Sequence, residues 1–550
     1  MKPQKNSSLL LYIMLLIPII SPKNSNEIEG RIRIDGDSNF IIETSNFSDE
    51  FSYIATAFYT PNLNETGWDF LSLTTNKNFR DELQAEAAGR LEASLTKERI
   101  YTHYQNMLST AGGLNDNAAK FFREQEYYLL SKKNQYNENP ILYNAYLLYL
   151  QYKGLREQYN KEMPEEKYIR EIEFNVMNSF GDVFDINTKY DTPEFYKMTI
   201  EELSDYFFLN NHCTAIFKTT PNLNDIFFGH DSWYYYNMMT RIFKEYNLNF
   251  NSPSVKTHNV MFSSYPGSLV SNDDFYYTSK GLVIIETTIE NYNTSSYKYI
   301  TEDSLLCWQR VQIANRMSAT SREWAENFMK YNSGTYNNQY MILDTKNVIF
   351  DNVNNYNKLL KESLVIIEQM PGFCEINDAT EHLRFGYWPS YNVPFSKNVQ
   401  DYANITKTLE TQTVARALMD YDICTRANIL RRDQENITDI DSMKFFMQYN
   451  NYLNDPFSLG EPTYTVAARG DLRTNRPLCF GAFDTKLGSV KELKSSGTKN
   501  IYLHAGPTSQ VEPLMDFNSV ACNGVKHEGI PDVPKFGWTI FSNKFNFEEY

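Results

Sequence analysis

The sequence pattern changes abruptly at Cys213, and this change restricts the possible fold more than any other feature of the chain. Residues 29–75 contain short strand-like runs, and residues 78–210 have the spacing of helices. After Cys213 the sequence becomes rich in strand-like runs again. Because helices and strands come in separate blocks, we expect an α+β fold with layered helices and antiparallel sheets, rather than a series of βαβ units.

Several segments after Cys213 predict particular elements. Residues 213–230 read as two strands joined by a turn, and residues 233–247 (WYYYNMMTRIFKEYN) read as a helix. A further helix is expected over residues 307–332, whereas the sequence after residue 430 is rich in turns with scattered helix. The other expected strands are NVMFSSYPG, DFYYTS, LVIIETTI, QYMILDT, NVIFD and SLVIIEQM.

Size and charge exclude some classes of protein. The chain has 550 residues, which is enough for a large buried core. Its net charge is −16, and no basic patch is present that would neutralise nucleic-acid phosphates. We therefore expect no DNA or RNA partner. Aromatic residues make up 15% of the chain, as in a globular protein and not a disordered one.

The N-terminus has the pattern of a secretory signal. Two lysines precede an apolar run over residues 9–20, which has the length of a signal-peptide core and is short for a membrane span. We assign residues 1–24 as a signal peptide and expect no stable membrane span. An uncleaved anchor formed by residues 9–20 is the rival interpretation. Later apolar runs do not approach the length of a span.

If the protein is secreted, both N-glycosylation and disulfide formation become possible. Candidate glycosylation triplets N-x-[ST] occur after the signal, although this Asn-rich sequence also makes them by chance. They lie at Asn46, Asn64, Asn293, Asn404 and Asn436. The six cysteines are far apart and form no C-x-x-C motif, which argues against a zinc site or a dense disulfide framework. Cys479 and Cys522 could pair, a question that the sequence alone leaves open.

Common catalytic motifs are absent. The chain has no G-x-S-x-G, no H-E-x-x-H and no P-loop. The acids Asp231, Asp273 and Asp274 could suggest a metal, but adjacent acids are common in turns. We therefore predict no metal and no cofactor.

Cys213 remains as the candidate nucleophile. A cysteine beside apolar residues is more often a buried structural thiol, and His230, 17 residues later, could be its base or simply a polar strand end. Another activation is available: cleavage before Cys213 would free an α-amino group with a pKa of about 8, next to the thiol. The stretch LNNHC-TAIFK fits this, because a polar, turn-like segment precedes the cysteine and an apolar strand follows it.

Longer motifs in this order resemble one family. They are NETGW (64–68), CTAIFK followed by GHDSWYYYNMMTRIFKEY, SSYPGSLVSNDDFYYTSKGLVIIETT, NSGTYNNQYMILD, YWPSYNVP, RANILRRDQENITDIDSMKFFMQYNNYLNDPFS and FGAFDTK. Together they resemble the phospholipase B-like (lamina ancestor) family, whose members are N-terminal nucleophile hydrolases. The resemblance implies an αββα sandwich of two antiparallel sheets between helices. It also implies cleavage of the His212–Cys213 bond.

On this resemblance, residues 25–212 and 213–550 would be two chains of one domain that stay associated after cleavage, with a homodimer left open. Roles carry over to matching positions: Cys213 as nucleophile with its freed amine as base, and His230 and Trp233 lining the pocket. Thr288 would lie near the nucleophile. Two further residues take polar roles, Asn392 as an oxyanion donor and Arg426 in orienting the nucleophile or binding substrate.

Each of these residues also has a structural interpretation. His230 could cap a strand end, Trp233 could belong to the core, and Thr288 could be an ordinary β-branched strand residue. Asn392 could be a turn residue, and Arg426 could belong to a structural ion pair.

The resemblance implies a secreted or lysosomal acyl hydrolase. Its substrate would be a phospholipid or another acyl lipid, with a fatty acyl group removed through a thioester on Cys213. An amidase acting on lipid amides or peptide-like amides is the alternative, since both reactions pass through a tetrahedral oxyanion. A catalytically inert, secreted lipid-binding glycoprotein is the hypothesis from a different class.

Overall fold

A computed structural model of the chain describes residues 26–48, 50–110, 116–193, 197–210, 213–351, 357–411, 416–495 and 497–545. The predicted signal peptide and His212 lie outside these described residues. Within them, no helix is both long enough and apolar enough to cross a membrane.

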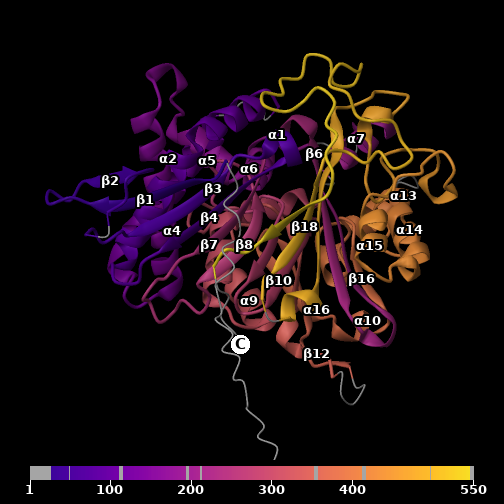
Figure 1. Cartoon of the computed structure of the whole chain (residues 1–550). Helices are drawn as coiled ribbons and strands as arrows, with labels where there is room; N and C mark the ends of the chain where they lie inside the picture. The colour runs from indigo at the N-terminus through magenta and orange to yellow at the C-terminus, as the bar shows by residue number, and fades with distance from the viewer. Residues whose placement is uncertain are drawn as a thin grey trace, which may run out of the picture.

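Two large sheets form the centre of the described structure (Figure 1). The first has eleven strands in the order β15 (Phe373–Asp378), β14 (Leu364–Met370), β11 (Asn338–Asp344), β10 (Leu282–Thr288), β9 (Phe275–Thr278), β8 (Asn259–Ser264), β7 (Arg241–Asn247), β4 (Trp68–Thr75), β3 (Ala55–Thr60), β1 (Ile28–Ile34) and β2 (Phe40–Glu43). The second has six, in the order β16 (Tyr387–Ser390), β5 (Cys213–Thr219), β6 (Ile226–Tyr235), β17 (Phe480–Ser489), β18 (Asn500–Ala505) and β19 (Thr539–Ser542). A separate short pair is β12 (Val348–Ile349) with β13 (Lys358–Leu359).

Among the described strands, neighbours in the sheets are antiparallel with one exception, the parallel pair β4–β7. This pair joins the strands that precede the helical block to the strands that follow Cys213. The register runs from Trp68 opposite Arg241 to Thr74 opposite Asn247. The two parts of the chain therefore share one hydrogen-bonded sheet.

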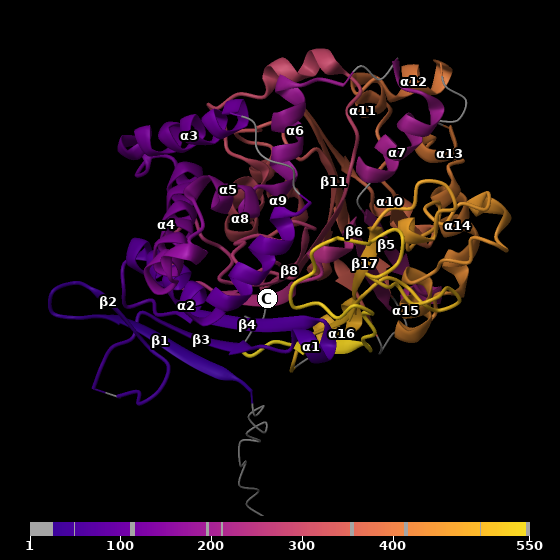
Figure 2. The same cartoon turned by 90° about the horizontal axis from the view of Figure 1, so that it is seen from above.

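Helices cover the outer faces of both sheets. The short helix α1 (Leu63–Thr66) lies between β3 and β4, and the helical block before Cys213 contains α2 (Asp81–Leu108), α3 (Asp116–Ser131), α4 (Pro140–Glu162), α5 (Glu171–Asn178), α6 (Phe180–Tyr190) and α7 (Ile200–Asn210). Later helices are α8 (Cys307–Met317), α9 (Ser321–Phe328), α10 (Thr380–Arg384), α11 (Lys397–Tyr402), α12 (Ile405–Thr411), α13 (Arg416–Met419), α14 (Thr425–Asp433), α15 (Ile440–Met447) and α16 (Val490–Lys494). Figure 2 shows α4 and α8 on one side of the molecule and α14 and α15 on the other.

Three apolar layers hold this arrangement together. The central layer lies between the sheets and joins Phe243 and Ile285 of the first sheet to Phe217 and Phe228 of the second. A second layer packs α2, α4, α8 and α9 on the first sheet, and a third packs α14 and α15 on the second. Burial of apolar surface against both faces of each sheet is the main stabilising contribution. The predicted α+β class, with two sheets between helical layers, is confirmed.

The predicted helix over residues 233–247 is wrong. The structure continues β6 to Tyr235, makes a single turn of 3₁₀ helix, and then forms β7. All but the last residue of β7 is buried, because this strand lies in the middle of the first sheet between β4 and β8. Its charged residues resemble a helical pattern locally, but Lys244 is buried and pairs with Glu92 of α2 at 2.7 Å. Pairing with distant strands overrides the local pattern.

Two other expectations need correction. The expected helix over residues 307–332 is two helices, α8 and α9, because the chain is extended at Ser318 and Thr320 between them. The turn-rich region after residue 430 contains β17, a ten-residue buried strand at the centre of the second sheet. Gly481 and Ala482 separate its two phenylalanines, and the polar residues Asp484, Thr485 and Lys486 follow them, which hides the strand pattern in the sequence.

Cys479 and Cys522 form a disulfide, the pairing that the sequence left open. The bridge anchors the segment before β17 to the C-terminal region, 43 residues later. The other four cysteines are free: Cys213, Cys307 and Cys424 are buried, and Cys374 is half-buried.

Candidate active site

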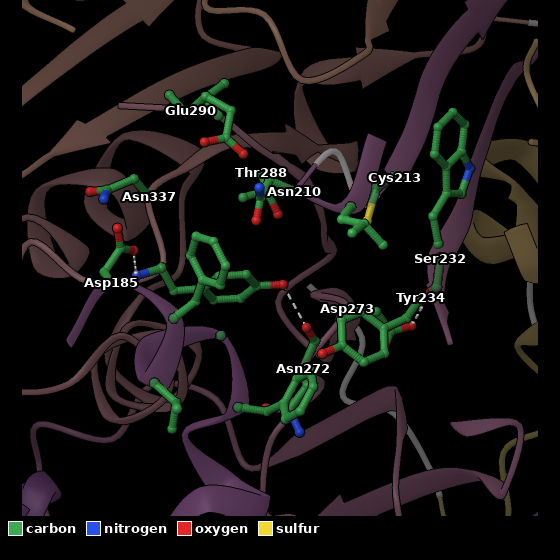
Figure 3. A pocket seen from close by; sticks show the side chains of 18 of the residues that line it. Asp185, Asn210, Cys213, Ser232, Tyr234, Asn272, Asp273, Thr288, Glu290 and Asn337 are labelled. Atoms are coloured by element: carbon green, nitrogen blue, oxygen red, sulfur yellow. Dashed lines mark hydrogen bonds between the residues drawn. The ribbon is translucent and has the colours of Figure 1, made fainter. Parts of the chain in front are cut away.

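Cys213 is the first residue of β5 and lies at the wall of a cavity. The strand runs between β16 and β6, and Cys213 is opposite Ser232 of β6 in the ladder. Only 2% of the residue is exposed, and its side chain lines a cavity of about 370 Å³ (Figure 3). The expected strand start at Cys213 is therefore confirmed.

The thiol of Cys213 has one carboxyl partner, Glu286 of β10. The sulfur donates a hydrogen bond to Glu286 Oε1 over 3.8 Å, and Tyr336 Oη donates to the same oxygen over 3.3 Å. His230 of β6 lies close by: the Cys213 sulfur, a His230 ring nitrogen and a Glu286 carboxyl oxygen are all within 4.8 Å of one another. All three side chains are buried. Thiol, imidazole and carboxyl groups are thus gathered from both sheets.

Burial sets the protonation of this cluster. Loss of water raises the pKa of the Cys213 thiol, and the neighbouring Glu286 raises it further. Burial, with the charge of Asp274, also raises the pKa of Glu286. The pKa of His230 is lowered by burial and by the Lys486 cation. The thiol and the imidazole are consequently neutral at neutral pH, so the thiol needs a proton acceptor to become a nucleophile.

Arg426 of α14 connects the candidate residues on the outer side of the second sheet. Its guanidinium donates to the backbone oxygen of Cys213 over 2.7 Å and to Asn392 Oδ1 over 2.7 Å. It also lies on the ring of Trp233, 4.5 Å from the centroid. Asn392 Nδ2 in turn donates to the backbone oxygen of Thr288 over 2.7 Å. Arg426 thereby fixes the start of β5 relative to β6 and β10.

The predicted pocket residues lie close together in the structure, but only some of them line the cavity. Trp233 and Thr288 line the cavity beside Cys213. His230, Asn392 and Arg426 are buried behind the lining, where they contact the lining residues. The amide of Asn392, predicted to stabilise an oxyanion, is bonded to Thr288 and Arg426 in this structure.

A buried ion cluster lies beneath the nucleophile. Asp273 accepts hydrogen bonds from Arg241 over 2.8 Å, from Lys486 over 2.7 Å and from Ser232 Oγ over 2.9 Å. Burial alone would raise the pKa of Asp273, but the two cations outweigh it and hold this pKa well below its usual range. Since Ser232 is the cross-strand neighbour of Cys213 and is bonded to Asp273, the cluster also holds the part of β6 beside the thiol in place.

The glycosylation candidates differ in their environments. Asn46, Asn64 and Asn436 are exposed, whereas Asn293 and Asn404 are half-buried. The amide nitrogen of Asn293 donates to the backbone oxygen of Tyr402 over 2.8 Å. The first three positions are thus the more accessible ones in the folded chain.

Sequence reasoning missed Glu286 and the role of Asp273. Glu286 stands in LVIIETT, a run that is otherwise apolar or β-branched. An acid in a strand buried on both faces conflicts with the local pattern, and such conflicts often mark functional positions. The pairing of Asp273 with Arg241 and Lys486 joins three distant segments and has no local signal.

Known protein families include one whose sequence pattern matches most of this chain. The family model described as phospholipase B matches residues 55–541. This chain belongs to the phospholipase B family. The match includes Cys213, Glu286 and every other candidate residue named above except Asn46.

Individual members of the phospholipase B family align over nearly the same length. The chain is 35% identical to phospholipase B-like 1 of Bos taurus over 496 residues, which cover 88% of this chain and 87% of that protein. It is 34% identical to phospholipase B-like 1 of Homo sapiens, with 88% and 86% covered. It is 33% identical to phospholipase B of Crotalus adamanteus, with 88% and 87% covered.

Proposed function

We propose that the protein is an acyl hydrolase that becomes active when the His212–Cys213 bond is cut, and that it removes fatty acyl groups from phospholipids. The observation that carries the proposal is the position of Cys213, which begins β5 and directs its thiol into a cavity. The names of the phospholipase B relatives support the substrate class.

Cleavage would use the groups gathered around the thiol. In the uncleaved chain the nitrogen of Cys213 is an amide and offers no base, so the thiol proton passes to Glu286 in the fraction of molecules in which this carboxyl group is ionised. The sulfur then adds to the carbonyl carbon of residue 212, and the bond to the Cys213 nitrogen breaks as that nitrogen gains a proton. Water hydrolyses the resulting thioester, which leaves a carboxyl group on residue 212 and a free amine on Cys213.

Acyl transfer would follow on the freed residue. The amine of Cys213 takes the thiol proton, and the sulfur attacks the acyl carbonyl of the lipid. The alcohol leaves with the proton held by the amine, and a thioester remains. Water, deprotonated by the same amine, releases the fatty acid. Arg426 holds the carbonyl of Cys213 throughout, so the nucleophile keeps its position after the chain is cut.

Two features support a stable two-chain product. The strand pair β4–β7 and the helical layer of α2 and α4 join residues 25–212 to residues 213–550 through a shared sheet and core. Cutting one bond leaves these contacts in place. The signal-like N-terminus and the disulfide between Cys479 and Cys522 fit a secreted or lysosomal location.

The first experiment follows cleavage itself. Intact mass of the denatured protein is measured during incubation over about pH 4.5 to 8, for the parent and for Cys213→Ala. We expect two fragments that meet at His212–Cys213 in the parent and a single chain in the variant. An unbroken parent chain at every pH would contradict the mechanism, and a cleaved Cys213→Ala chain would show that another protease cuts it.

The second experiment separates the ester from the amide reaction. Cleaved protein is incubated with a lysophospholipid and with an amide lipid that carries the same acyl chain. We expect release of fatty acid from the ester, and none when Cys213 is alkylated. Turnover of the amide alone would contradict the phospholipid proposal, and turnover of neither would favour a binding protein.

A further inference from the structure

The end of the cavity away from Cys213 is acidic. Asp185 of α6 and Glu290, two residues after β10, both line the cavity. Figure 3 shows them on the opposite side of the view from the Cys213 sulfur, with Asn337 next to Asp185. The two residues are only 8% and 9% exposed. Two carboxyl groups are therefore withdrawn from bulk water at one end of a chamber that has a nucleophile at the other.

These two carboxyl groups have no cationic partner among the described residues. Asp185 Oδ2 accepts a hydrogen bond from the backbone nitrogen of Tyr336 over 2.7 Å. The carboxyl of Glu290 has neither a hydrogen bond nor an ion pair with any described residue. Among the residues that the structure describes, the cavity lining includes no Lys, Arg or His, and its third acid, Asp273, is already neutralised by Arg241 and Lys486.

Aromatic side chains flank the unpaired acids. Tyr206 and Tyr297 line the same part of the cavity, and burial raises the pKa of both hydroxyl groups. The charges of Glu290 and Asp185 raise these pKa values further, which places the two rings beside the two carboxyl groups. Aromatic rings combined with unpaired carboxylates attract an organic cation, through the ring quadrupole and the opposite charge.

Burial without a countercharge is costly for these two carboxyl groups. Desolvation raises the pKa of Asp185 to about 7, and the nearby Asp182 contributes to the shift. A bound cation would supply the missing countercharge and stabilise the ionised carboxylates. A phosphate or carboxylate at the same place would meet like charges, and no described lining residue offers a basic side chain to offset them.

We propose that the acidic end of the cavity binds an ammonium group carried by the substrate. This inference rests on the proposed function and narrows its substrate class to acyl lipids with a cationic head group, choline or ethanolamine. The acyl carbonyl lies at Cys213, and the ammonium group lies between Asp185, Glu290 and Tyr297. The cavity has the size of a small-molecule site, which suits a head group and not a whole lipid.

Binding can be tested without any turnover. Glycerophosphocholine, glycerophosphoethanolamine and glycerophosphoglycerol are titrated into the purified protein by calorimetry. The variants are Glu290→Gln, which removes a charge at constant size, and Glu326→Gln, which removes the same charge from an exposed position on α9. We expect the two cationic compounds to bind, the glycerol compound to bind at least tenfold more weakly, and only Glu290→Gln to weaken the cationic compounds, by about tenfold.

Activity provides the second readout. On lysophospholipids with the same acyl chain, Glu290→Gln should lower kcat/KM for the choline and ethanolamine substrates about tenfold and that for the glycerol substrate much less, whereas Glu326→Gln should leave all three values unchanged. Equal binding of all three head groups, or binding that does not respond to Glu290→Gln in a variant with the parent melting temperature, would overturn the proposal. Head-group binding that depends on Glu290, without hydrolysis of any lipid, would support the cation site and contradict the proposed hydrolase.

Discussion

At the scale of single residues, the candidate site depends on which partners each buried polar group has. The guanidinium of Arg426 is buried, and burial lowers its pKa to about 10, so it remains charged at neutral pH. Its N–H groups meet the backbone oxygens of Cys213 and Tyr391 and the side chain of Asn392. Glu286, in contrast, has no ion pair with a described residue: its oxygen Oε1 meets the thiol and the Tyr336 hydroxyl, and Oε2 accepts from the side-chain amide of Asn338 in the orientation that satisfies both amide atoms. Arg426 therefore serves to position the site, and Glu286 is free to exchange a proton.

The Glu286→Gln variant tests this difference. Glutamine keeps a hydrogen-bond acceptor for the thiol but does not take its proton, so cleavage at His212–Cys213 should slow at least tenfold. Because burial raises the pKa of Glu286, its ionised fraction grows as the pH rises through that pKa. Cleavage of the parent should therefore accelerate with rising pH, and this dependence should disappear in the variant. Intact mass over time measures both.

Glu326→Gln serves as the control for cleavage, because Glu326 is exposed on α9. Its rate should equal that of the parent at each pH. If Glu286→Gln cleaves as fast as the parent, another group accepts the thiol proton.

At the scale of elements, the helical block is fixed by the close crossing of α2 and α4. Both helices carry a glycine at the crossing, Gly89 and Gly154. A Cβ at Gly89 would overlap the backbone oxygen of Gln151, and a Cβ at Gly154 would overlap that of Glu86. The two backbones thus touch where side chains would normally separate them. This contact sets the position of the layer that packs on the first sheet.

Gly89→Ala should destabilise the protein, although alanine is favoured over glycine within a helix by about 1 kcal/mol. The added methyl group forces the two helices apart, which costs about 1 to 3 kcal/mol in a tightly packed core. The melting temperature, followed by circular dichroism, should fall by several degrees. Gly36→Ala is the control, since a Cβ there has open space around it and should change little. A melting temperature of Gly89→Ala at or above that of the parent would contradict this packing.

At the scale of the whole molecule, the two sheets bury acids as well as apolar side chains. Burial raises the pKa of Asp185 and Glu368 to about 7 and that of Asp182 to about 6. Such groups hold protons in the folded state that the unfolded chain releases above about pH 4. The folded state therefore binds more protons between about pH 4 and pH 7, and the free energy of unfolding falls as the pH rises through this window.

We expect a melting temperature several degrees higher at about pH 5 than at about pH 7.5. The rise in the pKa of Asp185 from about 4 to about 7 corresponds to at most about 4 kcal/mol. The Asp185→Asn variant removes one of the titrating groups and should make the dependence on pH shallower. Calorimetry at the two pH values gives the comparison. Equal melting temperatures would mean that these acids are ionised in the folded protein.

Part of this structure is predictable from local sequence. The α+β class, the start of β5 at Cys213 and the helices from α2 to α7 follow from patterns within short windows of the chain. The resemblance to the family predicted Trp233, Thr288 and Arg426 as site residues, and all three lie near Cys213 in the structure. Local patterns misassigned β7 as a helix and did not show β17, since both strands exist through pairing with distant strands.

The sequence by itself determined the class of fold, the family and the identity of the nucleophile candidate. The tertiary structure alone decided which environment each carboxyl group of the cavity has: Glu286 contacts the thiol, Asp273 is neutralised by two cations, and Asp185 and Glu290 have no cationic partner among the described residues. These differences depend on charges brought within a few ångströms of one another and removed from water. Coulomb interactions and desolvation depend on distance and burial in space, and neither quantity is encoded by spacing along the chain.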